Sequence, residues 1–421
     1  MDDSEPAPPS RAHRSTGCPA DPATAPTAGS RHGLVKALGP GCLFAAVSVG
    51  ASHLVQSTRA GAGYGFSLMA VIVLALVLKY PLFEFGQRYA TATGHTLLEG
   101  YRRQGRWTLV LYVVLTLGTM FTVLAAVTAA TAGLAIQLTG LPWPVLAWSA
   151  VLLGGSGLLL VVGRYRLLDK AIKGIMIVLA VSTLAATVTV LPRLGGLQLF
   201  GPVGLMDVAF VVGLVGWMPT GMDVSVWQSF WALARRAETG HAPTLKETRF
   251  DFNLGYVGTG CLALMFCTLG TAVMFDQGVR IETAAGAFAG QVIDLYVSSL
   301  GPWSRPIIAV AAFTTMLSTM LTVLDGFPRA LQLAGRRLRG PEDPEEVASH
   351  SGRSWDYWAW MAAQAAGAML ILTVGLSSLT DLVDLATILS FLTAPLLGIL
   401  TYRAIVAPWV PAAFRPAPWL R

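Results

Sequence analysis

Three side chains that can bind a metal ion lie within two apolar stretches of the chain. His53 belongs to AVSVGASHLVQS (46–57), while Met218 and Asp223 belong to VVGLVGWMPTGMDVSVWQS (211–229). Imidazole, thioether and carboxylate together offer nitrogen, sulfur and oxygen donors, a set that suits Mn²⁺, Fe²⁺ or Zn²⁺ better than Mg²⁺. Such a set could form a transition-metal site if the two stretches lie against each other. Asp223 could instead cap the helix that restarts behind it.

Both stretches contain residues that weaken a helix near its middle. Gly50-Ala51-Ser52 precedes His53, and Pro219 and Gly221 precede Asp223. Proline removes a backbone donor and glycine lets the chain unwind. Freed backbone groups are tolerable inside a membrane only where they line a cavity or hold a ligand. The alternative explanation is that such residues only kink two packed helices. We expect further substrate contacts from the backbone or polar groups of Gly50, Ala51, Ser52, Gln56, Val215 and Thr220.

The elements that must position these groups are membrane helices. Of the 421 residues, 54% are hydrophobic and only 12% are charged, whereas about a quarter of the residues in a soluble domain are charged. A helix of roughly 20 apolar residues crosses the membrane core of about 30 Å. By that criterion we predict about ten spans within one domain (33–404), namely 37–63, 66–90, 108–137, 143–163, 171–192, 205–234, 252–275, 302–328, 355–377 and 382–404.

The distribution of basic residues predicts the topology. Arginine and lysine cluster before the first span and after the second, fourth, sixth and eighth spans, while the intervening loops carry few. The positive-inside rule then predicts a multi-pass protein of the cytoplasmic membrane, in contact with the lipid bilayer, with both termini in the cytoplasm. Residues 1–32 are predicted to form a disordered cytoplasmic tail and residues 405–421 a second cytoplasmic tail. The net charge of +6 therefore does not indicate nucleic-acid binding.

Four segments resemble the Nramp (natural resistance-associated macrophage protein) family of divalent-metal transporters, which share the LeuT fold. They are GPG (39–41), AVSVGASHLVQSTRAGAGYG (46–65), KYPLFEFGQRYATATG (79–94) and GWMPTG (216–221). The resemblance implies an all-α fold of two inverted five-helix repeats whose first and sixth helices are broken and face each other. It also implies that Met218 stands at the position of the family's sulfur ligand. Because the resemblance places the two broken helices opposite each other, we predict His53, Met218 and Asp223 as the metal ligands.

The chain departs from the family at several functional positions. The Asp-Pro-Gly-Asn motif of the first helix reads Gly50-Ala51-Ser52-His53 here, so its carboxylate is absent and a histidine stands in place of the asparagine. Thr220 and Ser225 stand where the family has histidines in its sixth helix. Residues 108–137 contain no charged residue, although the family places an acid there on its proton route. The resemblance therefore supplies no residue that would couple transport to protons.

Several other ionisable residues lie near the ends of the predicted spans. Glu84 and Arg88 are four residues apart, a spacing typical of a structural ion pair, and they are weaker candidates for gating or coupling. Asp325 is predicted to close an inner gate with a basic loop. Arg59 is expected to extend its charge toward the outer interface.

The function we expect is a secondary transporter that moves a divalent metal cation across the cytoplasmic membrane by alternating access. The sequence contains no phosphate-binding glycine loop, metalloprotease motif or nucleophile elbow, so we expect neither enzymatic activity nor a cofactor. Two alternatives stay open. One is a symporter for an organic solute such as an amino acid on the same scaffold, and the other is a membrane sensor that does not transport.

Overall fold

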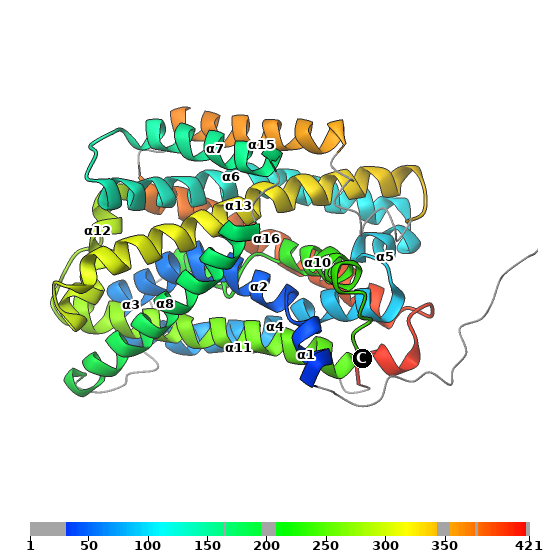
Figure 1. Cartoon of the computed structure of the whole chain (residues 1–421), viewed down its shortest axis with the longest axis horizontal. Coiled ribbons are helices and arrows are strands. Elements are labelled where there is room, and N and C mark those ends of the chain that lie inside the picture. The colour runs from blue at the N-terminus through cyan, green and yellow to red at the C-terminus, as the bar shows by residue number, and fades with distance from the viewer. Residues whose placement is uncertain (1–30, 163–165, 195–207, 343–353, 375–377, 418–421) are drawn as a thin grey trace, which may run out of the picture.

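All regular secondary structure in the described part of the chain is helical. The computed structural model describes residues 31–162, 166–194, 208–342, 354–374 and 378–417. The longer helices lie side by side in one bundle, with α7 and α15 along one side and α4 and α11 along the other (Figure 1). The main helices are α2 (Pro40–Ser48), α3 (Thr58–Tyr64), α4 (Met69–Thr93), α6 (Arg106–Thr139), α7 (Val145–Val162), α8 (Arg166–Val190), α9 (Val208–Trp217), α10 (Asp223–Thr239), α11 (Leu245–Gly270), α13 (Ser304–Arg339), α15 (Trp355–Val374) and α16 (Leu379–Val406).

The described part of the chain also contains shorter elements. A π-helical segment, η1 (Val49–Ser57), joins α2 to α3, and a second one, η5 (Thr271–Phe275), extends α11. Among the described residues, the remaining shorter helices are α1 (Arg31–Ala37), η2 (Gly65–Leu68), α5 (Leu97–Gln104), η3 (Leu191–Arg193), α12 (Ala285–Leu300) and η7 (Ala412–Phe414). The sequence analysis did not predict α12, because its 16 residues are too few to span a membrane. It lies at the opposite end of the bundle from α1 and α5 (Figure 1).

The predicted spans agree with the observed helices. Seven helical stretches among the described residues are long and apolar enough to cross a membrane, and two shorter apolar helices lie at Gly174–Val190 and Val208–Trp217. The first of the seven, Pro40–Thr93, contains two predicted spans. They meet at Gly65, whose φ of +57° lets the chain turn between α3 and α4. Large apolar side chains such as Leu74, Val77 and Leu78 are exposed on α4, as expected for a helix that faces lipid.

Both predicted interruptions are present. In the first span the backbone leaves helical geometry at Gly50, with ψ of −106°. In the sixth span α9 ends at Trp217, and α10 begins only at Asp223. The fold is therefore the predicted LeuT-type arrangement, in which a broken helix begins each five-helix repeat.

The GPG segment (39–41) fixes the start of the first broken helix. The carboxylate of Asp251 in α11 accepts hydrogen bonds from the backbone N–H groups of Gly39 (2.9 Å) and Gly41 (2.7 Å), and from the side-chain amide of Gln87 (2.7 Å). A carboxylate at a helix N-terminus satisfies amides that have no partner inside the helix. A Cβ atom at Gly41 would lie 2.0 Å from the carbonyl oxygen of Asp251, so only glycine allows α2 to approach α11 this closely.

We expect Asp251→Asn to destabilise the protein. The NH₂ group of the new asparagine would face N–H donors that now bond to the carboxylate. Leaving such a buried donor without an acceptor costs about 1–3 kcal/mol. The melting temperature of the purified protein in detergent should fall clearly. Asp294→Asn serves as the control, because Asp294 is 53% exposed where it pairs with Arg305, and exposed pairs contribute little. Equal melting temperatures for the two variants would contradict this role of Asp251.

Most of the predicted N-terminal tail (1–32) lies outside the described residues. At the other terminus, the described part of the predicted tail (405–421) packs against α4. There the indole N–H of Trp409 donates to the hydroxyl of Tyr89 at 3.2 Å, and Arg88 donates to the carbonyl of Arg415 at 3.3 Å.

Candidate functional site

A cavity lies between the two broken helices. Residues of η1, of the break between α9 and α10, and of α6, α13 and α16 all contribute to its wall. Its polar lining consists of Ser52, Thr220, Asp223, Thr319 and Ser390, together with Trp217 and Trp227. Most of the remaining lining is aliphatic or aromatic, with Val47, Val123, Val127, Val224, Val323 and Phe327. The cavity is therefore mainly apolar, with a few polar groups, as is typical of small-ligand sites.

Asp223 is the one acidic residue in the described lining of the cavity. Its side chain is 4% exposed, and the hydroxyl of Thr116 in α6 donates to its carboxylate at 3.4 Å. No lysine or arginine forms an ion pair with it among the described residues. Asp223 is also the first residue of α10, where the helix dipole stabilises a negative charge. A buried carboxylate with only this support can bind a cation.

Thr319 of α13 contacts the first broken helix next to its break. Its hydroxyl donates to the carbonyl of Ala46 at 2.8 Å, in the last turn of α2 before Gly50. A Cβ atom added to Gly50 would lie 2.2 Å from this hydroxyl oxygen. Thr319 therefore lies directly against the break, while Ala51 and Ser52 line the cavity beyond it.

His53 and Met218 are buried away from the described cavity lining. Both are fully buried, but neither is among the residues that line the cavity. The His53 ring lies against the backbone of Ser48 and Thr259, on the side of α11. Neither ring nitrogen makes a hydrogen bond within the described residues. Of the three predicted metal ligands, the structure thus places only Asp223 at the cavity, and the set as a whole stays a prediction.

Gln56 belongs to a polar cluster beyond the cavity. Its amide donates to the hydroxyl of Thr387 at 3.3 Å, and its oxygen accepts from Arg59 at 2.9 Å. Arg59 also makes two parallel bonds to Asp384, of 2.7 and 2.9 Å, and its guanidinium lies over the ring of Phe210 at 5.0 Å. Contrary to our expectation, Arg59 is 7% exposed. The reason is that the Asp384 carboxylate supplies a partner inside the bundle.

We expect the loss of stability to depend on which partner of this ion pair is replaced. Asp384→Asn leaves the buried Arg59 guanidinium without its counter-charge, whereas Arg59→Met leaves a carboxylate that is 30% exposed and can be hydrated. Thermal unfolding in detergent should therefore show a larger loss for Asp384→Asn than for Arg59→Met. The double variant should recover part of the loss. Equal, additive losses would show that the two charges do not act as a pair.

The predicted gating residues form ion pairs near the α1 and α5 end of the bundle. Glu84 pairs with Arg88 at 3.2 Å and with Arg249 of α11 at 3.1 Å. Asp325 pairs with Arg329 of the same helix at 3.2 Å and accepts a hydrogen bond from the hydroxyl of Tyr357 at 2.6 Å. These contacts tie neighbouring helices together, and a role in gating stays a prediction.

Lys79 is a residue that the sequence analysis missed. It lies in the middle of α4 and is 8% exposed. Its ammonium group donates to the carbonyl oxygens of Val215 (2.5 Å) and Gly216 (2.9 Å), at the end of α9. The Val215 carbonyl, which we predicted to face the substrate, is therefore bonded to Lys79. The available signal was a lysine inside an otherwise apolar span. Ionisable residues within membrane spans are rare and usually have a functional role.

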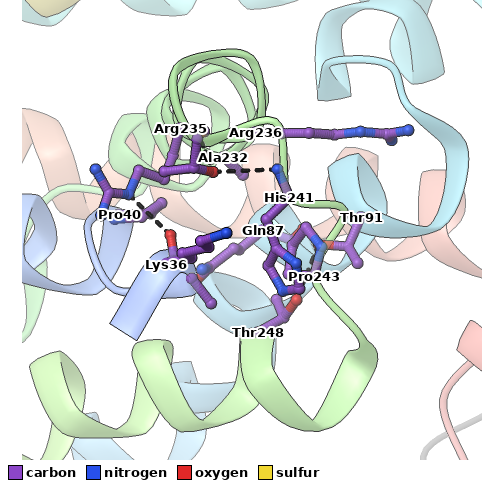
Figure 2. Close-up of a pocket in the computed structure, with 12 residues that line it drawn as sticks. Lys36, Pro40, Gln87, Thr91, Ala232, Arg235, Arg236, His241, Pro243 and Thr248 are labelled. Carbon is purple, nitrogen blue, oxygen red and sulfur yellow. Dashed lines mark hydrogen bonds between the residues drawn. The ribbon is translucent and has the colours of Figure 1, made fainter. Parts of the chain in front are cut away.

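A second hollow lies among α1, α4, α10 and α11. Figure 2 shows its lining residues, among them Lys36, Gln87, Arg235 and His241, with Arg235 donating to the backbone carbonyl of Lys36 at 3.0 Å. The described lining includes basic side chains and no carboxylate. With no carboxylate in its described lining, this hollow is a weaker candidate for a metal site than the cavity at Asp223.

The comparisons with known proteins agree with this architecture. The chain matches the family described as natural resistance-associated macrophage protein-like over residues 41–420. It is 37% identical over 308 residues to an uncharacterized protein of Pasteurella multocida (strain Pm70), an alignment that covers 71% of this chain and 70% of that protein.

Two solved structures are similar to the whole bundle. One is an Eremococcus coleocola manganese transporter in complex with an aromatic bis-isothiourea substituted compound, with a TM-score of 0.65 at 14% identity, covering 93% of this chain and 83% of that one. The other is MhsT in complex with L-phenylalanine, with a TM-score of 0.57 at 15% identity, covering 93% of each chain. At these identities the similarity shows the fold alone.

Proposed function

Because this chain belongs to the natural resistance-associated macrophage protein-like (Nramp) family, whose members are transporters and not enzymes, we propose that it moves a divalent metal cation across the cytoplasmic membrane by alternating access. Both termini would face the cytoplasm. The observation that carries the proposal is the buried Asp223 carboxylate at a cavity between two broken helices. Such breaks in corresponding positions of two repeats mark the substrate sites of transporters with this architecture.

The donors around the cavity favour a hard cation. Ser52, Thr220, Asp223, Thr319 and Ser390 offer oxygen atoms, whereas the imidazole of His53 and the sulfur of Met218 lie outside the described lining. Oxygen donors suit Mn²⁺ and Mg²⁺ better than Zn²⁺, which prefers nitrogen and sulfur. Within the Mn/Fe/Zn-like range expected from the sequence, we therefore propose Mn²⁺, with Mg²⁺ as the competitor to be tested. With one carboxylate available, the ion would keep part of its hydration shell.

One observation favours an organic solute instead. The cavity wall includes the rings of Trp217, Trp227 and Phe327, an aromatic lining larger than a metal ion needs. A symporter for an amino-acid-like solute would use this wall for the side chain and Ser52 and Thr220 for the polar end.

Uptake into liposomes tests both proposals. Purified protein would be reconstituted and offered Mn²⁺, Mg²⁺, Zn²⁺ and Ca²⁺, with a pH-sensitive dye inside the vesicles. We expect saturable Mn²⁺ or Mg²⁺ entry without acidification, because residues 108–137 contain no charged residue to carry protons. If folded protein moves none of the four ions, the metal proposal is wrong, and labelled amino acids become the next substrates to test.

A further inference from the structure

The broken sixth helix has one charged side chain at each of the two ends that face the break. Lys79 of α4 binds the C-terminal end of α9 through the Val215 and Gly216 carbonyls. Asp223 is the first residue of α10, at the N-terminal end of the second half. Each charge is opposite in sign to the partial charge of the helix end that it meets. The break is therefore neutralised by the protein's own side chains.

The contacts of Lys79 replace those that a bound cation would make. The last four carbonyls of a helix have no partner inside it, and inside a membrane they must be satisfied by a donor or a cation. At the end of α9, two of them accept hydrogen bonds from one ammonium group. No carboxylate forms an ion pair with Lys79 among the described residues, so its charge is balanced by the helix end itself.

We infer that the Lys79 ammonium group takes the place of a bound cation at the carbonyls of the α9 C-terminus. These carbonyls are then not available as ligands of the transported ion. The inference rests on the proposed function, since it assigns Lys79 as a positioning and specificity-determining residue for the cation at Asp223. The transported ion is then held by Asp223 and by neutral oxygen donors of the cavity. Its affinity is lowered by the like charge of the Lys79 ammonium group on the other side of the break.

The test compares two substitutions at Lys79. Lys79→Gln keeps a donor for the carbonyls but removes the charge, whereas Lys79→Arg keeps the charge. Lys36→Gln is the matched control, because Lys36 is exposed on α1. Mn²⁺ binding to each purified protein would be measured by calorimetry, and stability by thermal unfolding.

We expect Lys79→Gln to bind Mn²⁺ about three- to tenfold more tightly than the wild type, although its melting temperature falls. Lys79→Arg and Lys36→Gln should bind as the wild type does. A purely structural role predicts weaker or unchanged Mn²⁺ binding in Lys79→Gln, and that result would overturn the inference.

A second measurement covers the case in which Lys79→Gln does not fold, or in which the wild type binds no divalent ion. Lys79→Ala would be purified with ethylammonium or, as a neutral control, with propanol. We expect ethylammonium alone to raise the yield of folded protein and its melting temperature, because it supplies the missing cation to the α9 carbonyls. No difference between the two additives would overturn the inference. Absence of Mn²⁺ binding by the wild type would count against the proposed function only.

Discussion

Asp223→Asn should reduce divalent-metal uptake by about 10- to 100-fold, because a hydrogen bond or contact to a charged group contributes about 1.5–3 kcal/mol and about 1.4 kcal/mol corresponds to a factor of ten. The substitution keeps the shape of the side chain at the first residue of α10 and removes only its charge. The fold should therefore survive while the described cavity lining loses its one carboxylate. Initial uptake rates in liposomes, taken over a range of Mn²⁺ concentrations, are the measurement.

The matched control for this prediction is Asp381→Asn. Asp381 is exposed in the first turn of α16 and lies outside the described cavity lining. Its variant should transport at nearly the wild-type rate, since the same charge is lost from a solvated position. If both variants keep full uptake, Asp223 is not a ligand and the path of the ion lies elsewhere.

The second large effect is expected for Gly50→Ala. The new Cβ atom would lie 2.2 Å from the hydroxyl oxygen and 2.8 Å from the Cβ atom of Thr319, so α2, α13 or both must move. Overpacking of this kind costs about 1–3 kcal/mol, and at the break it also displaces Ala51 and Ser52 from the cavity wall. We expect a lower melting temperature together with a loss of uptake.

Two further variants separate this clash from a general effect of the substitution. Gly118→Ala, in α6, adds a methyl group with nothing within 4 Å and should leave the protein as stable or slightly more stable, because alanine favours helix. In the double variant Gly50→Ala with Thr319→Gly the clash is removed, and part of the stability should return. Failure of Thr319→Gly to recover any stability would show that Gly50 is required for its backbone conformation rather than for space.

Much of the fold could be predicted from the sequence. A run of about 20 apolar residues has few alternatives to a membrane helix, and the helix-weakening residues at 50–52 and 219–221 are located where the chain leaves helical geometry. Helix α12 was missed because a 16-residue amphipathic segment carries no such signal. Its position depends on packing against other helices, which a single sequence does not display.

The site was less predictable, because the choice of ligands depends on how helices rotate about their axes. His53 and Asp223 both follow a break, yet His53 faces α11 and Asp223 lines the cavity. The sequence contains no pattern that reports this difference. Thr319 was not singled out from the sequence either. In the structure it lies against Gly50 and leaves no room for a larger side chain at that position.

The most direct test of the central claim is to locate the ion. Crystals of the protein would be grown with Mn²⁺ and measured at a wavelength where manganese scatters anomalously. The account predicts the strongest anomalous peak in the cavity between the broken helices, in contact with the Asp223 carboxylate, and no such peak in crystals of Asp223→Asn. A peak on His53, or one that persists unchanged in Asp223→Asn, would contradict it.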